Sequence, residues 1–341
     1  MARKPSPVFE MEDLDEEASV SMTWSIDANG TMRHKMSGTK ISPEAGIEVM
    51  GREYRLSPDD IDVDASKHLG SGACGAVHLG VLKSTGQRVA IKTVKVEDKP
   101  KREQLLNEIR GLVSAEGCPN LVQWYAGFVH KRTNSVNVIL EFMDRGSLAD
   151  LKKKLGGAGV PEPHLACITC QVMAGLAHLH GRRFLHRDIK PENILHNNLG
   201  EVKLTDFGIA KDLDHTVAMA GTFVGTVTYM SPERCLGEDY DLASDIWSVG
   251  MVVFELATGM YPFKESDRDT FPKLFAKLCE EPEPRLDPGE YNPQLADFVA
   301  GCLTRDLATR PDTFRLCSHP YVTEGVGSCA EFAAFLATLP A

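Results

Sequence analysis

The stretch HRDIKPEN at residues 186–193, followed by a DFG tripeptide that begins at Asp206, decides the expected fold class. It places a carboxylate (Asp188), a cation (Lys190) and an amide (Asn193) on one short loop. Asp206 adds a second carboxylate thirteen residues after Asn193. Phosphoryl transfer needs a carboxylate that accepts a hydroxyl proton, a cation near the moving charge, and two oxygen ligands for magnesium. The pattern therefore predicts Asp188 as the base, Lys190 beside the transferred phosphate, and Asn193 and Asp206 as magnesium ligands.

A glycine-rich segment, GSGACGAV at residues 70–77, lies upstream between two expected strands, Val77–Val81 and Arg88–Val94. A dinucleotide-binding fingerprint would lead into a helix, so the context favours a hairpin over nucleotide phosphates. Backbone without Cβ atoms can approach a phosphate closely. A flexible hairpin without a ligand is the alternative, and the VAIK stretch at residues 89–92 on the next strand argues against it.

Lys92, the last residue of that VAIK stretch, stands in an alternating apolar run and is expected near the interior. A buried lysine needs an anionic partner. The expected partner is Glu108, on a helix predicted over Glu103–Val113 from its apolar period. Glu103 is the rival, but Glu108 lies among the apolar positions and four residues before Leu112. Lys92 would hold the α- and β-phosphates and Glu108 would orient it.

The composition of the 341 residues restricts the class of protein further. A hydrophobic content of 43% suits one large core or two lobes, and a net charge of −11 argues against nucleic acid as a partner. Nine scattered cysteines, and no apolar amino-terminal signal, predict reduced thiols in the cytoplasm, with the nucleus as a second location. No apolar run reaches the roughly 20 residues of a membrane span.

Along the chain, strand-like segments precede helical ones. Residues 1–20 are acidic and proline-rich and are expected to be disordered, whereas residues 21–54 are expected to form a short hairpin or to lie loosely on the domain. Val136–Phe142 reads as a buried strand. Helices are predicted over 163–181, 241–258, 271–280 and 293–303. The expected fold class is α+β, with a small β-rich amino-terminal lobe and a larger, mainly helical carboxy-terminal lobe.

These motifs resemble those of a eukaryotic protein kinase, and the resemblance runs from about residue 61 to residue 323. It implies a kinase domain at 55–323, with a regulatory and docking extension at 1–54 and a tail at 324–341. It also implies that Glu233 pairs with Arg310. The helix that contains the Asp245-Ile246-Trp247 stretch would support the catalytic loop. The nucleotide-binding residues that it implies are Gly70, Ser71, Gly72, Ala73, Cys74, Gly75, Val77, Lys92, the gatekeeper Leu140, and the hinge residues Glu141 and Met143.

The segment at residues 215–234, HTVAMAGTFVGTVTYMSPER, is similar to the activation segment of MAP kinase kinases, particularly those of plants. The plant pattern has two hydroxyl residues with five residues between them, which Thr216 and Thr222 match. In animal members of the family, the first hydroxyl residue lies four residues before the second, and Ala218 occupies that position in this chain. The resemblance implies a monomeric, dual-specificity kinase that uses ATP and magnesium. Its substrate would be a MAP kinase, and an upstream MAP kinase kinase kinase would phosphorylate Thr222 and Thr216.

Two other functions stay open at this point. The first is another serine/threonine kinase of the same broad group, similar to a MAP kinase kinase kinase; the activation segment argues against it. The second is a pseudokinase scaffold, which usually lacks one of the four residues Lys92, Asp188, Asn193 and Asp206, all of which are present here.

Two short patterns have a functional and a structural interpretation. Arg3-Lys4 followed by Phe9 and Met11 is either a docking motif for a MAP kinase or a charged, solvated tail. The CxxC at Cys167–Cys170 lies within an expected helix and lacks a second ligand pair, so it is interpreted as packing and not as a zinc site.

Overall fold

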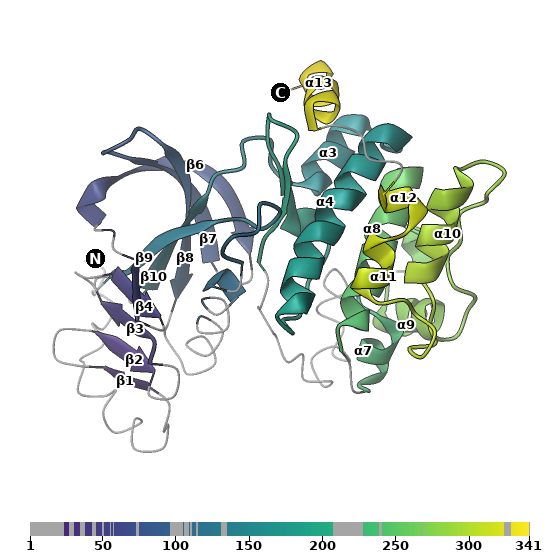
Figure 1. Ribbon diagram of the computed structural model, residues 1–341, viewed down its shortest axis with the longest axis horizontal. Helices are drawn as coiled ribbons and strands as arrows, with labels where there is room; N and C mark the ends of the chain where they lie inside the picture. Colours follow the sequence, from purple (N-terminus) through teal and green to yellow (C-terminus); the bar gives the residue numbers. More distant parts are fainter. Residues whose placement is uncertain are drawn as a thin grey trace, which may run out of the picture. The chain divides into compact units, whose positions relative to one another are not determined.

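The computed structural model of the chain (Figure 1) describes residues 24–26, 31–34, 38–42, 46–49, 51–54, 56, 58–72, 75–95, 105, 109, 111–113, 115–130, 135–206, 228–238, 241–267, 269–323 and 329–340. They fall into two compact units. The small unit takes its residues from the chain up to Arg102 and from Trp124–Phe142, and the large unit contains Glu103–Gln123 and the chain from Met143 onward. A strand-rich unit and a helical unit agree with the predicted fold class.

The main sheet of the small unit is antiparallel, in the order β6-β7-β8-β10-β9. Its strands are Ile61–Gly72 (β6), Gly75–Leu82 (β7), Arg88–Lys95 (β8), Trp124–His130 (β9) and Ser135–Glu141 (β10). The predicted strands at 77–81, 88–94 and 136–142 are therefore confirmed, together with the turn between β7 and β8. Buried residues of four strands form one core cluster: Ile61, Val89, Ile91, Ala126, Phe128 and Ile139.

A second antiparallel sheet in the small unit contains five short strands in sequence order. They are Trp24–Ile26 (β1), Met32–His34 (β2), Lys40–Ser42 (β3), Gly46–Val49 (β4) and Arg52–Tyr54 (β5). Strands β3, β4 and β5 pack against β9. The side chains of Ile41 and Ile47 are fully buried. This segment therefore forms a larger structure than the short hairpin expected from the sequence, because it buries apolar side chains of its own against β9.

The large unit is mainly helical. Its longer helices are Leu148–Leu155 (α3), Glu162–Gly181 (α4), Ala243–Thr258 (α8), Phe271–Cys279 (α9), Pro293–Cys302 (α10) and Cys329–Thr338 (α13). The shorter helices are Pro232–Leu236 (α7), Thr313–Cys317 (α11) and Pro320–Thr323 (α12). The hairpin strands are Ile194–His196 (β11) and Val202–Leu204 (β12). Single helical turns occupy Pro191–Asn193 and Glu265–Asp267 in this unit, and Pro58–Asp60 in the small unit.

Helices α4 and α8 form the centre of the large unit, since α4 contacts α8, α11, α12, α13 and β12. Most residues of α8 are buried, and Trp247 is fully so. The four helices predicted over 163–181, 241–258, 271–280 and 293–303 correspond to α4, α8, α9 and α10. In the predicted helix Glu103–Val113, the described residues Leu105, Ile109 and 111–113 are helical.

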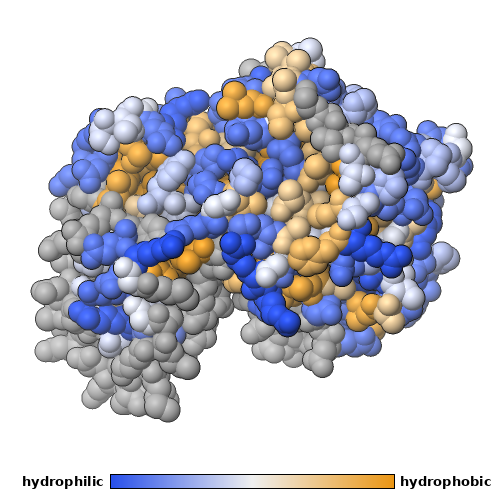
Figure 2. Space-filling model, in the orientation of Figure 1, coloured by the Kyte–Doolittle hydropathy of each residue, from blue (hydrophilic) through white to orange (hydrophobic). Residues whose placement is uncertain are grey.

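Hydrophilic residues cover much of the visible face, and hydrophobic residues form smaller groups between them (Figure 2). Within the described part of the chain, no helix has both the length and the apolar character that crossing a membrane requires.

Candidate active site

The loop between α4 and β11 brings Asp188, Lys190 and Asn193 together. Lys190 Nζ and Asn193 Nδ2 each donate to Asp188 Oδ2 at 2.7 Å. Asn193 Nδ2 also lies 2.8 Å from the backbone oxygen of Asp188. The side chains of Asp188 and Lys190 stay 28% and 21% exposed. The carboxylate is therefore held in one orientation and remains accessible to a substrate hydroxyl.

A buried carboxylate on α8 holds the backbone of this loop. Asp245 is 1% exposed and accepts hydrogen bonds from the backbone nitrogens of His186 and Arg187, each at 2.8 Å. His180 Nε2 lies 3.0 Å from the same carboxylate. Burial alone would raise the pKa of Asp245, but the hydrogen bond with His180 and further interactions with His186 hold it below its ordinary value. The predicted support of the loop by this helix is confirmed.

Backbone strain and burial mark two residues of the loop. Arg187 has a φ of 70°, in the left-handed region that non-glycine residues rarely adopt. His186 is fully buried, and its Nδ1 accepts a hydrogen bond from the backbone nitrogen of Asp188 at 3.3 Å. Burial lowers the pKa of His186, so its ring is neutral at pH 7. The geometry gives His186 a structural role, which is the role expected from the sequence.

The hairpin of β11 and β12 brings Asn193 and Asp206 into the same region. The backbone nitrogen of Thr205, the residue before Asp206, donates to the backbone oxygen of Asn193 at 3.0 Å. Because the amide nitrogen of Asn193 is used on Asp188, its amide oxygen is directed elsewhere. An amide oxygen and a carboxylate are the hard ligands that magnesium prefers, so these residues fit that ion. Among the described residues, no cluster of three or more histidine, cysteine or acidic side chains offers another metal site.

The glycine-rich segment forms the β6–β7 hairpin of the small unit. Gly70 pairs with Val77, Gly72 pairs with Gly75, and Ser71 lies between the two glycines on β6. The segment thus joins two strands, as predicted, and no helix follows it directly.

Close packing occurs where β7 and β8 meet. Gly75 has a φ of 147°, and a Cβ at this position would lie 1.7 Å from the backbone oxygen of Thr93, so only glycine fits.

Lys92 on β8 is 3% exposed and lies opposite Val77 on β7 and Val138 on β10. The predicted burial of Lys92 is confirmed.

The residues predicted to contact adenine lie at the end of β10 and just after it. Leu140 is buried, Glu141 is the last residue of β10, and Met143 is buried. The border between the two compact units falls between Phe142 and Met143. The chain therefore passes from the small unit to the large unit here, as a hinge segment must. Contact of these residues with adenine stays a prediction.

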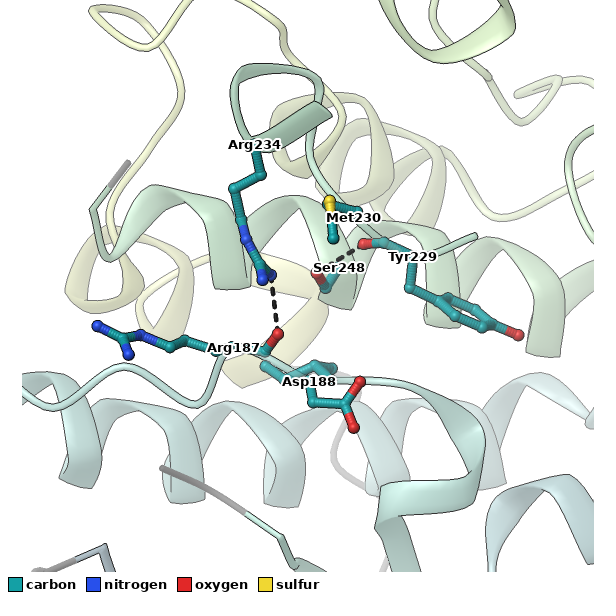
Figure 3. Close-up of a pocket in the computed structure, with 7 residues that line it drawn as sticks. Arg187, Asp188, Tyr229, Met230, Arg234 and Ser248 are labelled. Carbon is teal, nitrogen blue, oxygen red and sulfur yellow. Dashed lines mark hydrogen bonds between the residues drawn. The ribbon is translucent and has the colours of Figure 1, made fainter. Parts of the chain in front are cut away.

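A small pocket lies beside Asp188 in the large unit (Figure 3). Arg234 Nη1 donates to the backbone oxygen of Arg187 at 2.8 Å, and Ser248 Oγ donates to the backbone oxygen of Tyr229 at 2.7 Å. The guanidinium of Arg187 and the carboxylate of Asp188 point in opposite directions (Figure 3). The pocket is lined by Arg187, Asp188, Ile189, Tyr229, Met230, Arg234 and Ser248.

Sequence reasoning missed Glu255, a buried carboxylate on α8 that anchors the segment before α7. It accepts a hydrogen bond from the hydroxyl of Tyr229 at 2.5 Å and forms an ion pair with Lys152 of α3. Burial, and next the charge of Glu255, raise the pKa of Tyr229, so its hydroxyl stays protonated. The available signal was an acidic residue in the apolar second half of this helix, because a buried charge needs partners.

A buried ion pair fixes α7. Arg310 Nη1 and Nη2 donate to the two carboxylate oxygens of Glu233 at 2.9 and 3.1 Å. The guanidinium also lies 5.4 Å from the ring centre of Trp247. The predicted pairing of Glu233 with Arg310 is confirmed.

Several predicted site residues lie outside the described residues, namely Ala73, Cys74, Glu108, Thr216 and Thr222. Their roles stay predictions, as does the docking motif at residues 3–11. The CxxC residues Cys167 and Cys170 lie within α4, as expected. Burial raises the pKa of the Cys167 thiol to about 11, which agrees with packing and not with metal binding.

The fold and this loop geometry together define a protein kinase. The protein kinase domain family matches residues 63–322, and the chain belongs to that family. It is therefore an ATP-dependent protein kinase.

Curated relatives narrow the class to MAP kinase kinases. The chain is 37% identical to Mitogen-activated protein kinase kinase 2 of Arabidopsis thaliana, over 87% of this chain and 82% of that protein. It is 39% identical to Mitogen-activated protein kinase kinase SIPKK of Nicotiana tabacum, over 86% of this chain and 84% of that protein. It is also 42% identical to Dual specificity mitogen-activated protein kinase kinase 1 of Dictyostelium discoideum, over 62% of this chain and 32% of that protein.

Proposed function

We propose that this chain transfers the γ-phosphate of ATP to a threonine and a tyrosine in the activation loop of a MAP kinase. The observation that carries this proposal is the similarity to plant MAP kinase kinases over more than four fifths of both chains. The words "dual specificity" in the name of the Dictyostelium relative support acceptors of both kinds.

The residues of the loop supply the chemistry. The carboxylate of Asp188 accepts the proton of the substrate hydroxyl, or orients that hydroxyl for attack. Lys190, whose ammonium is 2.7 Å from Asp188, brings positive charge to the site of transfer. The oxygens of Asn193 and Asp206 would hold magnesium, which neutralises the charge of the phosphates when it is bound. Lys92 binds the α- and β-phosphates, and Glu108 orients Lys92.

We further propose that an upstream MAP kinase kinase kinase activates the chain by phosphorylating Thr222 and Thr216. A phosphate adds about two negative charges and three acceptor oxygens at neutral pH. Arg187 is the cation next to Asp188 and would bind such a phosphate. If a Thr222→Ala protein reaches the full activity of the parent after treatment with an upstream kinase, this part of the proposal fails.

One alternative is another serine/threonine kinase of the same broad group. The chain is also 34% identical to Misshapen-like kinase 1 of Rattus norvegicus, over 75% of this chain and 20% of that protein, but its identity to MAP kinase kinases is higher. A pseudokinase scaffold is the other alternative; the paired Asp188 and Lys190 count against it.

The proposed compartment is the cytoplasm, with the nucleus as a second location, and the proposed state is a monomer. Scattered cysteines and a net charge of −11 support an intracellular protein that binds no nucleic acid. Imaging of a fluorescent fusion tests the compartment, and localisation to a secretory compartment would contradict it.

The test is phosphorylation of a catalytically inactive MAP kinase with Mg-ATP, with the modified residues identified by mass spectrometry. The parent, activated by an upstream kinase, is expected to modify both the threonine and the tyrosine of the activation loop. Asp188→Asn keeps the shape of the side chain and should abolish transfer, whereas Asp297→Asn on the exposed surface should not. Phosphate on general serine and threonine substrates alone would assign the chain to another kinase branch.

A further inference from the structure

The hydrogen bonds that hold the catalytic loop continue beyond Asp245, to a short helix late in the large unit. His180, the second-last residue of α4, lies between two other side chains. Its Nε2 is 3.0 Å from the carboxylate of Asp245, and its Nδ1 contacts the hydroxyl of Thr313, the first residue of α11. All three side chains are buried, so they form one chain of hydrogen bonds inside the unit.

The chemistry of the three groups sets the direction of these hydrogen bonds. A carboxylate only accepts, so His180 must present its Nε2–H to Asp245. In a neutral imidazole the other nitrogen, Nδ1, is then the acceptor, and the threonine hydroxyl is the donor. The hydroxyl also fixes the orientation of the ring, because a ring turned by 180° would put carbon atoms in place of both nitrogens.

The hydroxyl of Thr313 is held at a fixed place beside α4. Asp312 caps the start of α11, since its Oδ1 accepts a hydrogen bond from the backbone nitrogen of Arg315 at 2.8 Å. At the other end of α11, Cys317 Sγ lies 3.7 Å from the backbone oxygen of Met173 on α4. Helix α11 also packs along α4. The short helix therefore presents the hydroxyl to the ring from a rigid position.

The carboxylate of Asp245 transmits the position of the ring to the loop. The oxygen that contacts His180, Oδ2, also accepts the backbone nitrogen of His186 at 2.8 Å. The other oxygen accepts the backbone nitrogen of Arg187 at 2.8 Å. Linked hydrogen bonds in a buried network strengthen one another. A change at the ring therefore reaches the backbone directly before Asp188, the proposed base.

We propose that Thr313 is a positioning residue for phosphoryl transfer. Its hydroxyl keeps the ring of His180 in the orientation in which Nε2–H stabilises the carboxylate of Asp245. That carboxylate holds the loop backbone, and the loop places Asp188 at the acceptor hydroxyl. Without the threonine hydroxyl, Nδ1 would be buried and unpaired, which costs free energy, so the ring moves. The inference rests on the role proposed for Asp188, but not on the identity of the protein substrate.

Thr313→Val keeps the size of the side chain and removes the hydroxyl. A misplaced base acts on the transition state, so kcat is expected to fall about tenfold. Each KM, for ATP and for the acceptor protein, is expected to stay within about twofold of the parent value. Thr313→Ala also lacks the hydroxyl, without the branched methyl groups, and should show the same loss. Thr313→Ser retains the hydroxyl and should restore most of kcat.

Thr169 on α4 offers a matched control. It is fully buried, and its hydroxyl donates to the backbone oxygen of Leu165 at 2.8 Å. Thr169→Val therefore makes the same chemical change in the same unit, outside the chain of hydrogen bonds that reaches Asp245. Its kcat is expected to stay within about twofold of that of the parent.

The experiment uses the full chain, as the parent and as these variants, after treatment with the same upstream kinase. Intact mass spectrometry checks that the proteins carry equal phosphate, and circular dichroism checks that they are folded at the assay temperature. Steady-state kinetics with Mg-ATP and one acceptor protein then give kcat and both KM values. Asp188→Asn, measured in parallel, should show no transfer, so a failure of the proposed base is seen separately.

A low kcat confined to the two variants that lack the Thr313 hydroxyl would support the proposal. It is overturned if both of these variants turn over as fast as the parent, or if they change KM alone. A loss of equal size in Thr313→Ser would show that the hydroxyl is not the active group. An equal loss in Thr169→Val would show a general effect of altered packing, which also contradicts the proposal.

Discussion

Asp245 shows how a single buried side chain determines the shape of the catalytic loop. Its carboxylate accepts the backbone hydrogens of His186 and Arg187 and contacts His180. These contacts hold Arg187 in a left-handed conformation, which costs free energy, and thereby fix the backbone that leads to Asp188. The position of Asp188, the proposed base, thus depends on a buried carboxylate of α8.

Asp245→Asn should lower the free energy of unfolding by about 1–3 kcal/mol, because an amide NH₂ group would replace an oxygen that accepts a hydrogen bond. Phosphoryl transfer should fall as well, since the loop loses its anchor. Urea denaturation followed by fluorescence measures the first effect. The control is Asp297→Asn, which alters an exposed aspartate–histidine pair with an 81% exposed carboxylate; the expected change is within about 0.5 kcal/mol. Equal losses in the two variants would contradict the role given to Asp245.

The same residue predicts a pH dependence. The pKa of Asp245 is lower in the folded chain than its ordinary value, so the unfolded chain binds its proton more readily. Its contribution to stability is therefore complete well above the ordinary aspartate pKa of about 3.9 and is lost as the pH falls through the folded value. The stability difference between the parent and Asp245→Asn should be constant from neutral pH down to about pH 5 and then shrink. A difference that grows on acidification would contradict this sign.

At the scale of elements, the five-stranded sheet of residues 24–54 is fitted to β9. Gly127 on β9 has no room for a side chain, because a Cβ there would lie 2.5 Å from Cδ1 of Ile47 and 3.0 Å from the backbone oxygen of Asn137. Ile47 on β4 is fully buried and cannot turn aside into solvent. Gly127 of the main sheet and Ile47 of the second sheet therefore have complementary shapes, because the isoleucine fills the space that a side chain at Gly127 would occupy.

Gly127→Ala should destabilise the protein by about 1–3 kcal/mol, the usual effect of overpacking a core. Ile47→Val removes the clashing methyl group and alone should cost about 0.5–1.5 kcal/mol. The double variant should lose less than the sum of the single losses, because the valine makes room for the new methyl group. Denaturant unfolding of all four proteins gives the coupling. Additive losses would show that β4 and β9 do not pack as described.

Helix α13 is a second element that the sequence did not predict, since a tail was expected there. Phe332 is fully buried, and the ring of His164 on α4 stacks on Phe335 with centroids 4.4 Å apart. Phe332→Ala should lower the free energy of unfolding by about 3–5 kcal/mol through loss of apolar contact and the cavity left behind. Thermal or urea unfolding measures it. Phe314→Ala, at a position 56% exposed, is the matched control and should change little; if both variants lose the same stability, α13 is not packed on α4 as described.

At the scale of the whole molecule, the sequence predicted the long helices and the residues that belong to short motifs. The helix predicted over 163–181 has about the bounds of α4, and the resemblance gave the Glu233–Arg310 pair. The sheet of residues 24–54 was not predictable, because its strands contain three or four residues and their pairing depends on distant contacts with β9.

The central claim about the whole molecule is the transfer of phosphate to two kinds of acceptor. The most direct measurement is the intact mass of a catalytically inactive MAP kinase after incubation with the activated chain and Mg-ATP. The account predicts the addition of two phosphate groups. Substrate variants that lack the activation-loop threonine or the tyrosine should each gain one, and Asp188→Asn should add none. Phosphate that is absent from the tyrosine, or unaffected by the loss of both acceptors, would contradict the claim.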